Sequence, residues 1–482
     1  MGQAVETVLG RWSDGPGPLH RKLSDALRRA VERGHLASGE RLPSERDLAA
    51  RLAVSRSTVV AAYDTLRQER LVESRQGSGT RIRPRPAGGT PRTGFELSPV
   101  YRSLIDGPGE LISLACAIFP AHPLVAEAVA TVIDEDGAKL LTHNGYVPAG
   151  LPALREALAD VLTDDGVPTT PDQVLVTTGA QQAVSLATQL LVRPGDDVVV
   201  ESPSHSGTLD AFRARGARLV AVPVDDDGVD TRAVADIVTA RPPAALYLMS
   251  TFHNPTGAML SARRRREIAE LVAEHGIPLI EDNALEGAPL HEERLPPIAA
   301  FAPPDAPALT AGSFSKAAWG GLRVGWMRGP APMINRLAEL KAMNDLGSPL
   351  LDQAIATRLA PQLAQLRADH MVYLRRNLEI VTSRLRELLP SWEWREPRGG
   401  PSLWIRLPVG TAAAYAQVAL RYGVEVIPGD VMSPHSEHGS YLRMPFAEEP
   451  PVLEETMRRL AQAWEAYSPT EEPSRPAAPV VV

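Results

Sequence analysis

Short apolar runs alternate with helical stretches through the middle of the chain. The runs are 197–200, 218–223, 244–249, 277–281 and 308–311. Such alternation predicts a parallel sheet covered by helices, which is the arrangement of an α/β domain. A long helical region near residues 331–389 follows and leads into a smaller α+β lobe. We therefore expect an α/β body over residues 109–467, with its small lobe at about 370–467.

The N-terminal part has a different pattern. Apolar residues recur at helical spacing over 19–31, and Ser44 and Ser55 are placed to cap two further helices. Residues 71–82 combine short β-prone runs with a Gly-Ser-Gly turn, which is typical of a hairpin. The order of helix, helix, turn, helix and hairpin predicts an α+β winged helix-turn-helix over residues 17–83.

Composition supports a chain of several domains. At 482 residues it has room for about three domains or lobes. Residues 84–108 are rich in Pro, Gly and Thr and are expected to form a linker, and the Pro/Glu-rich residues 468–482 are expected to be a disordered tail. No apolar run is long enough to cross a membrane, and the N-terminus lacks the features of a secretory signal. We expect a cytoplasmic protein with no membrane partner.

Cysteine and charge narrow the chemistry further. The single cysteine, Cys116, excludes a disulfide within the chain and a cysteine zinc site, and no metal site is predicted. The net charge is −8, but residues 20–83 carry 14 Lys and Arg against 8 Asp and Glu. A basic module therefore precedes an acidic body. Basic charge alone fits nucleic-acid binding and a solvated helical surface equally well.

A resemblance to the GntR family of winged-helix regulators is carried by Arg41-Leu42-Pro43-Ser44-Glu45-Arg46-Asp47-Leu48-Ala49, then by Val54-Ser55-Arg56-Ser57-Thr58-Val59 and Tyr63. The third helix begins with short hydroxyls and exposed N–H groups that can meet phosphates or base edges, and Arg56 is the best candidate for base reading. The partner is then a double-stranded DNA operator; the alternative is a module for protein contacts. We expect DNA contacts from Arg46, Ser55, Arg56, Ser57, Thr58 and Tyr63 in the helices, and from Arg75, Gln76, Gly77 and Ser78 in the hairpin.

Lysine is rare, which shortens the search for a reactive amine. Of four lysines, only Lys316 directly follows an apolar strand, in Ser313-Phe314-Ser315-Lys316. This neighbourhood resembles fold-type I aminotransferases, and the whole chain resembles the MocR-type regulators, which join a GntR head to such a domain. The resemblance implies that Lys316 forms a Schiff base with pyridoxal 5′-phosphate. The implied cofactor site consists of Gly179, Ala180, Gln181, His205, Asn254, Asp282, Ser313, Ser315, Lys316 and Arg323.

The family assigns a role to each part of this site. Arg323, the serine hydroxyls and the N-terminus of the helix after Gly179 would hold the phosphate. Asp282 would pair with the pyridine nitrogen and Asn254 with the ring O3′, while His205 would lie against the ring. Two further residues, Tyr146 and Arg443, are expected to bind the substrate or effector, with Arg443 holding an amino acid's carboxylate.

The sequence departs from the family pattern near this site. Positions 284 and 285, where relatives carry a tyrosine, are Ala284 and Leu285. His205 replaces a larger aromatic ring, and 114–117 lacks an expected glycine. The leading hypothesis is a homodimeric regulator that senses an amine or amino acid through aldimine formation. The alternatives are an active aminotransferase that carries a DNA-binding head, and a body that binds no cofactor and serves only for dimerisation.

Overall fold

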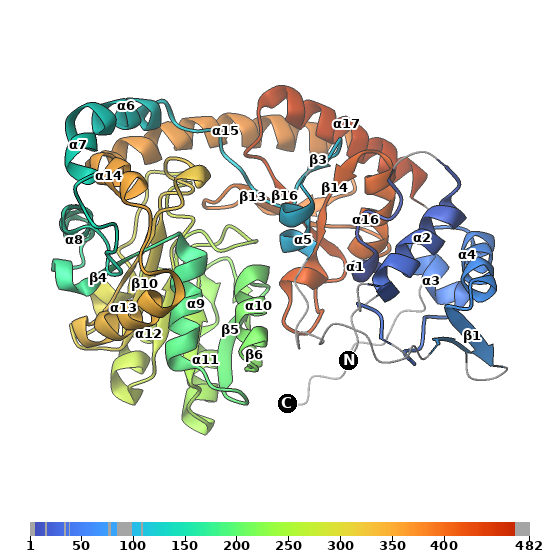
Figure 1. Ribbon diagram of the computed structural model, residues 1–482, viewed down its shortest axis with the longest axis horizontal. Helices are drawn as coiled ribbons and strands as arrows, with labels where there is room; N and C mark the ends of the chain where they lie inside the picture. The colour runs from blue at the N-terminus through green and yellow to red at the C-terminus, as the bar shows by residue number, and fades with distance from the viewer. Residues whose placement is uncertain are drawn as a thin grey trace.

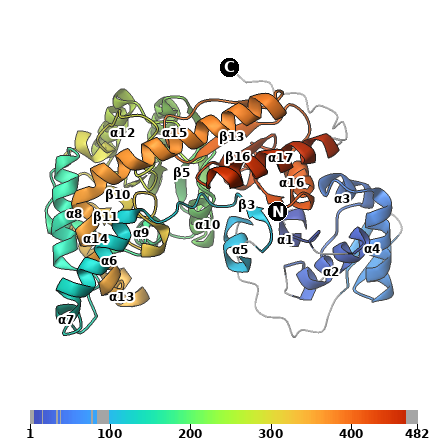
Figure 2. The same ribbon diagram turned by 90° about the horizontal axis from the view of Figure 1, so that it is seen from above.

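The computed structural model describes residues 5–14, 17–32, 35–37, 39–75, 79–83, 99–107 and 109–467. The chain forms a small N-terminal head, a large domain and a C-terminal small lobe. Figures 1 and 2 show the small lobe in the middle, with the head on one side and the large domain on the other.

The head is the winged helix-turn-helix that the sequence predicts. Its elements are α1 (Val5–Leu9), α2 (Leu19–Glu32), α3 (Glu45–Arg51), α4 (Arg56–Gln68), β1 (Val72–Arg75) and β2 (Gly79–Ile82). Ser44 and Ser55 cap α3 and α4 by accepting hydrogen bonds from the backbone N–H groups of Asp47 and Thr58. The sequence did not predict α1, which adds Val8 and the following Trp12 to the same apolar core. The strands β1 and β2 pair antiparallel.

The large domain is built on a mixed sheet. Within the described residues this sheet has eight strands in the order β4-β11-β10-β9-β8-β5-β6-β7. The strands are β4 (Val174–Thr177), β5 (Asp197–Ser202), β6 (Arg218–Asp225), β7 (Gly228–Val229), β8 (Ala245–Leu248), β9 (Leu279–Asp282), β10 (Ala308–Ser313) and β11 (Gly325–Arg328). The prediction of a parallel sheet needs correction, because β11 runs antiparallel to both β4 and β10, and β7 antiparallel to β6.

Helices cover both faces of this sheet. They are α8 (Pro152–Asp164), α9 (Ala180–Leu191), α10 (Ser206–Ala214), α11 (Thr231–Ala240), α12 (Ala262–His275) and α13 (Ala331–Asp345). Side chains alternate along each strand, so Val198 and Val200 pack with α9 and α10 while Val199 packs with α11 and α12. Every residue of β8 and β9 is buried, which explains the nearly continuous apolar runs in the sequence.

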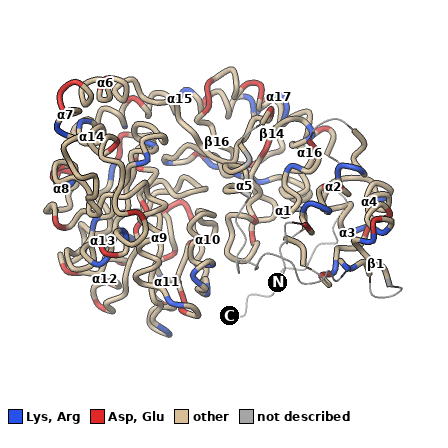
Figure 3. Tube along the Cα trace, in the orientation of Figure 1, with Lys and Arg blue, Asp and Glu red and all other residues tan. Residues whose placement is uncertain are grey.

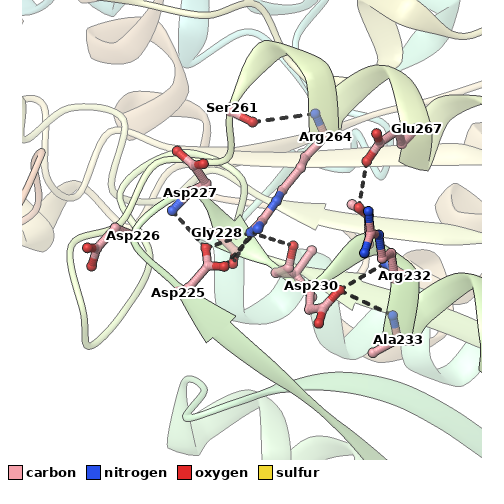
Figure 4. Close-up of polar contacts among 12 residues, drawn as sticks. Asp225, Asp226, Asp227, Gly228, Asp230, Arg232, Ala233, Ser261, Arg264 and Glu267 are labelled. Carbon is pink, nitrogen blue, oxygen red and sulfur yellow. Dashed lines mark hydrogen bonds and ion pairs between the residues drawn. The ribbon is translucent and has the colours of Figure 1, made fainter.

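An arginine clamp fixes the acidic turn at the β7 edge of the sheet (Figure 4). Arg264 of α12 donates two hydrogen bonds of 2.6 and 2.7 Å to the Asp225 carboxylate, and its Nη1 also donates to the carbonyl oxygen of Gly228 at 2.9 Å. In the next turn, Asp230 caps α11 by accepting from the backbone N–H groups of Arg232 and Ala233. The clamp ties the β6–β7 hairpin to a helix that covers the sheet.

One long helix joins the large domain to the small lobe. That helix is α15 (Leu363–Leu388), while α6 (Pro123–Thr131), α7 (Gly137–Leu140) and α14 (Leu350–Leu359) pack in the large domain. The first turn of α15 packs in the large domain and its later turns in the small lobe. The small lobe contains β12 (Glu393–Trp394), β13 (Ser402–Arg406), α16 (Ala412–Arg421), β14 (Val424–Glu425), β15 (Ile427–Pro428), β16 (Tyr441–Pro445) and α17 (Pro450–Ala466).

Two short elements precede the large domain. Helix α5 (Pro99–Asp106) lies within residues 84–108, which were expected to be a linker. The C-terminal part of the predicted linker is therefore helical. Strand β3 (Ile112–Ser113) pairs parallel with β14 of the small lobe. The predicted tail at 468–482 lies outside the described residues. Across the described part of the chain, no helix is long and apolar enough to span a membrane, and no cluster of potential metal ligands occurs.

The head docks on the small lobe through specific contacts. The indole Nε1 of the buried Trp12 donates to Gln417 of α16 at 2.8 Å. Arg421, at the end of the same helix, donates to the carbonyl oxygens of Leu52 and Ala53. Ala53 has a left-handed backbone, with φ of 48°, and packs against the apolar core of the small lobe. Docking therefore involves the turn between α3 and α4.

Candidate ligand site and DNA-binding surface

Several strand ends meet at one edge of the large sheet and carry the predicted site. Asp282 at the end of β9 is in register with Ala311 of β10, and Ser313 with Gly325 of β11. The loop that carries Lys316 follows β10, and α9 begins just after β4. In α/β sheets, ligands bind outside the carboxyl ends of the strands. The predicted residues therefore converge where such a fold places its binding crevice.

Lys316 is held against the segment 112–117. Its Nζ donates to the carbonyl oxygen of Ala117 and lies 5.9 Å from the centre of the Phe119 ring. Burial lowers the pKa of Lys316 to about 8, and the positive charges of Arg443 and Arg323 act in the same direction. About a tenth of this amine is then neutral at pH 7, and the neutral form is the one that acts as a nucleophile.

Asp282 is buried and accepts two hydrogen bonds. The Tyr247 hydroxyl donates to its Oδ2 at 2.8 Å, and the backbone N–H of Ala284 donates to its Oδ1 at 3.0 Å. Sequence reasoning missed Tyr247, a fully buried residue in β8. The available signal was a hydroxyl within an otherwise apolar strand, because a buried phenol needs a polar partner.

His205 lies at the N-terminus of α10, beside the other charged groups. Its Nδ1 and the Thr208 Oγ1 are 3.1 Å apart. Burial lowers the pKa of His205, and the nearby Arg443 and Lys316 lower it further, while Asp282 opposes them. The imidazole is therefore neutral at physiological pH.

An anion cradle lies beside Lys316. Gly179, with φ of 117°, precedes α9, and a Cβ placed on it would lie 3.1 Å from Nη2 of Arg323. Arg323 donates to the carbonyl oxygen of Thr178 at 2.6 Å. Ala180 and Gln181 form the first turn of α9, and the hydroxyls of Ser313 and Ser315 are 2.9 Å apart. Helix N–H groups, hydroxyls and a guanidinium form a donor set suited to a phosphate.

Arg443 is a buried cation with spare hydrogen-bonding capacity. Its Nη2 donates to the carbonyl oxygen of Ala115, and its Nε has no hydrogen-bond partner in the described part of the chain. Burial lowers its pKa. Asn254, predicted to contact the cofactor ring, is half-buried and follows the buried His253. Arg443 thus satisfies only part of its donor capacity within the protein, as expected of a group that awaits a carboxylate.

Tyr146 does not join this group. Its side chain is 66% exposed in this single chain, and its role in binding the substrate or effector stays a prediction. Its neighbour Val147 instead packs close to Gly347, in the turn after α13.

The predicted DNA-binding residues mostly gather at the start of α4. Ser55, Arg56 and Ser57 are exposed, as is Arg46 in α3. The Ser55 hydroxyl is 2.8 Å from those of Ser57 and Thr58. The side chain of Arg56 is 71% exposed and lies 3.3 Å from Glu45. Figure 3 shows basic residues on the head helices.

The predicted DNA contact of Tyr63 requires a correction. Tyr63 is fully buried in the core of the head, and its hydroxyl donates to the carbonyl oxygen of Pro43 at 2.9 Å. It therefore supports the turn before α3 rather than contacting DNA. Residues 76–78, predicted to contact DNA, lie outside the described residues, and nothing is described of the Arg75 side chain.

Comparison with known proteins decides the family. Residues 120–463 match the aminotransferase class I and II family, and residues 19–82 match the gntR family of bacterial regulatory proteins. The HTH-type transcriptional regulator YisV of Bacillus subtilis is 30% identical over 454 residues, which cover 89% of this chain and 93% of YisV. The chain belongs to the MocR-type regulators. Another relative of this MocR-type regulator, the pyridoxine biosynthesis regulator PdxR of Corynebacterium glutamicum, is 30% identical and covers 80% of this chain and 82% of its own length.

A solved aminotransferase structure supports the fold of the body. LysN, the α-aminoadipate aminotransferase of Thermus thermophilus in complex with N-(5′-phosphopyridoxyl)-L-leucine, is 28% identical with a TM-score of 0.69. The match covers 76% of this MocR-type chain and 94% of LysN. The residues of this chain fit a phosphorylated pyridine aldehyde, because a lysine, a buried carboxylate and the anion cradle beside Gly179 lie at one sheet edge.

Proposed function

We propose that this MocR-type regulator binds pyridoxal 5′-phosphate at Lys316 and senses an amine or amino acid there, so that ligand binding changes how the DNA-binding head is held. The bound cofactor supplies an aldehyde carbon that exchanges one amine for another. The lowered pKa of Lys316 supports its role as the resident amine. Asp282 would hold the pyridine nitrogen, and Arg323, Ser313, Ser315 and the start of α9 would hold the phosphate.

Arg443 suits an effector with a carboxylate. It is buried, and its guanidinium Nε has no hydrogen-bond partner among the described residues. A ligand carboxylate can accept two parallel hydrogen bonds from one arginine, which neutralises a buried charge. Such binding competes with the present hydrogen bond from Arg443 to the carbonyl oxygen of Ala115. Arrival of a ligand at Arg443 therefore acts on the segment 112–117.

The observation that carries this proposal is that the segment 112–117 touches both the ligand site and the docking site of the head. Its carbonyl oxygens at Ala115 and Ala117 accept from Arg443 and Lys316. Its Ser113 hydroxyl donates to Glu425 of β14. Glu425 in turn forms a 2.8 Å ion pair with Arg11 of the head. A ligand that binds more tightly when the head is docked than when it is undocked, or the reverse, would thereby shift the docking equilibrium.

The docking contacts also lie close to the DNA-reading helix. Arg421 holds the carbonyl oxygen of Ala53 at 3.0 Å, and Ser55, two residues later, is the N-cap of α4. Movement of the small lobe would therefore be transmitted to the start of α4, where the DNA-contacting residues are expected.

An exposed apolar surface supports a homodimer. Leu141, at the end of α7, is 88% exposed, and Leu351 of α14, a helix that contacts α7, is 47% exposed. Exposed clusters of large apolar side chains indicate interfaces. In a homodimer, Tyr146 can serve the ligand site from the partner subunit, and two heads can read paired half-sites.

Absorbance and turnover test the proposal. The purified protein is expected to show the visible band of protein-bound cofactor, and Lys316→Ala is expected to lose it. Titration with amino acids should change the spectrum of a sensor in one turnover, without repeated release of keto acid. Because Lys316, Asp282 and Arg443 meet in one site, repeated release would instead identify an active aminotransferase. A wild-type protein without the band would leave the body as a dimerisation module alone.

A further inference from the structure

A continuous chain of hydrogen bonds connects His205 with Asp282 through the interior of the large domain. From Nδ1 of His205 the chain passes to the hydroxyl of Thr208 at 3.1 Å and from there to the hydroxyl of Tyr247 at 3.1 Å. Tyr247 then donates to Oδ2 of Asp282 at 2.8 Å. Thr208 and Tyr247 are both fully buried, so water does not compete for these groups.

The direction of this chain follows from counting hydrogens. An ionised carboxylate only accepts, so the single hydroxyl hydrogen of Tyr247 points to Asp282. The Tyr247 oxygen then accepts the hydrogen of Thr208. With its own hydrogen engaged, the Thr208 oxygen can only accept from His205. The neutral imidazole of His205 must therefore carry its proton on Nδ1, which leaves Nε2 as an acceptor.

The protonation states agree with this order. Burial and the adjacent Asp282 carboxylate raise the pKa of the Tyr247 phenol well above its ordinary value, so the phenol stays a donor. Burial lowers the pKa of His205, with Arg443 and Lys316 acting in the same direction and Asp282 opposing them. A neutral His205 adds no charge beside the amine of Lys316.

We propose that Thr208 and Tyr247 are positioning residues that let Asp282 select the Nδ1–H tautomer of His205 and fix the orientation of its ring. The use of this arrangement rests on the proposed function, in which His205 lies against the cofactor ring and Asp282 pairs with its pyridine nitrogen. A hydrogen-bonded partner commonly sets which ring nitrogen of a histidine is protonated. The phenol that donates to Asp282 comes from Tyr247 in β8.

The tautomer can be measured without any cofactor. In the full-length protein labelled with 15N-histidine, the imidazole 15N shifts of His205, assigned with His205→Asn, are expected to show the Nδ1–H form. Thr208→Val keeps the side-chain shape but removes the hydroxyl, and it should move His205 to the Nε2–H form or to a mixture. Thr208→Ser restores the hydroxyl and should restore the wild-type shifts. Wild-type shifts in Thr208→Val, or an Nε2–H form in the wild type, overturn the proposal.

Cofactor affinity supplies a second readout. Tyr247→Phe removes one of the two donors to Asp282, and it should weaken binding of pyridoxal 5′-phosphate about tenfold, in the range expected for a hydrogen bond to a charged group. An unchanged dissociation constant would contradict the positioning role of Tyr247. If the wild type fails to bind the cofactor, the proposed function fails, while the tautomer shifts still decide whether Thr208 and Tyr247 position His205.

Discussion

Arg11 of the head and Glu425 of the small lobe form a two-pronged ion pair, in which Arg11 Nη2 lies 2.8 Å from Oε2 and Nε 3.3 Å from Oε1 of Glu425. Both side chains are mostly buried, and Ser103 and Ser113 also donate to Glu425. Charge pairs removed from water lose more on truncation than exposed pairs, because the remaining charge stays buried without its partner.

Arg11→Ala is expected to loosen the docked head. Amide hydrogen exchange in residues 48–56 and 421–426 should become about tenfold faster, and bound ligand should no longer change it, because the route from the ligand site ends at Glu425. Ligand affinity should change as well, because a ligand that shifts the docking equilibrium binds the loosened state with a different affinity. The control is Arg406→Ala, which removes an exposed pair with Glu393 in the same lobe. Wild-type exchange in Arg11→Ala would argue against docking through this pair.

The pKa of Lys316 predicts how cofactor capture depends on pH. Because burial lowers the pKa to about 8, the neutral amine is the minor form below this pH and the major form above it. The rate of pyridoxal 5′-phosphate binding to the cofactor-free protein should rise about tenfold from pH 7 to pH 9. Stopped-flow absorbance measures this rate. An inflection near the ordinary lysine pKa would show that the amine is not perturbed. A flat profile would show that deprotonation of Lys316 does not control the binding rate.

Gly179 provides a steric test of the anion cradle. Gly179→Ala should weaken cofactor binding by about tenfold or more, because the added methyl would crowd Arg323 and force a left-handed backbone on alanine. Gly195→Ala is the matched control, since Gly195 also has a positive φ but no atom within 4 Å of the added Cβ. Equal losses of affinity in the two variants would mean that backbone strain alone is responsible.

The arginine clamp at the sheet edge predicts a stability effect that depends on pH. Arg264→Ala should lower the free energy of unfolding by about 1–3 kcal/mol, since it removes the arginine's hydrogen bonds to the Gly228 carbonyl oxygen and to the Asp225 carboxylate. Hydrogen bonding to Arg264 lowers the pKa of Asp225 despite some opposing desolvation. Stability from this pair is therefore present above pH 4 and is lost as the pH falls through the lowered pKa.

Urea unfolding at pH 7 and at pH 3 measures this contribution. Asp226→Asn serves as the control, because Asp226 forms an exposed ion pair with Arg395, which should contribute little. The difference between wild type and Arg264→Ala should narrow at pH 3. A difference that is independent of pH would assign the effect to packing of the arginine rather than to its charge.

Arg56 is the predicted base-reading residue. Arg56→Ala should weaken operator binding and reduce discrimination at the contacted base by about 1–3 kcal/mol. Arg29→Ala removes the same charge from an exposed position in α2 and should weaken binding to all sequences alike, if at all. Comparison of the two variants on operator and mutated operator separates reading from general attraction. Unchanged discrimination in Arg56→Ala would exclude it as a reader.

Patterns that depend on local spacing were predicted well from the sequence. The apolar runs became strands of the large sheet, and Ser44 and Ser55 became helix caps. Tyr63 was assigned to DNA although it shares the helical spacing of Val59 and Leu66, and that spacing correctly marks it as a core position. The assignment to DNA followed the family motif, although the helical spacing of the same residues predicted a buried position.

Features that depend on long-range pairing could not be predicted. Strand direction is absent from a pattern of apolar residues, so the antiparallel β11 was missed. The bond between Tyr247 and Asp282 joins residues 35 positions apart in two strands, and the pair Arg11–Glu425 joins residues 414 apart. Polar partners of this kind are chosen by the fold, and no local spacing marks them.

The turn at Ala53 limits how freely the head can be exchanged between regulators. Its carbonyl oxygen is held by Arg421 and its methyl group packs on the small lobe, so this part of the head is shaped by the body it rests on. A chimera that joins a foreign DNA-reading module to this body must supply matching groups at positions 11, 12 and 53. A graft without them would recognise its operator yet respond to no effector.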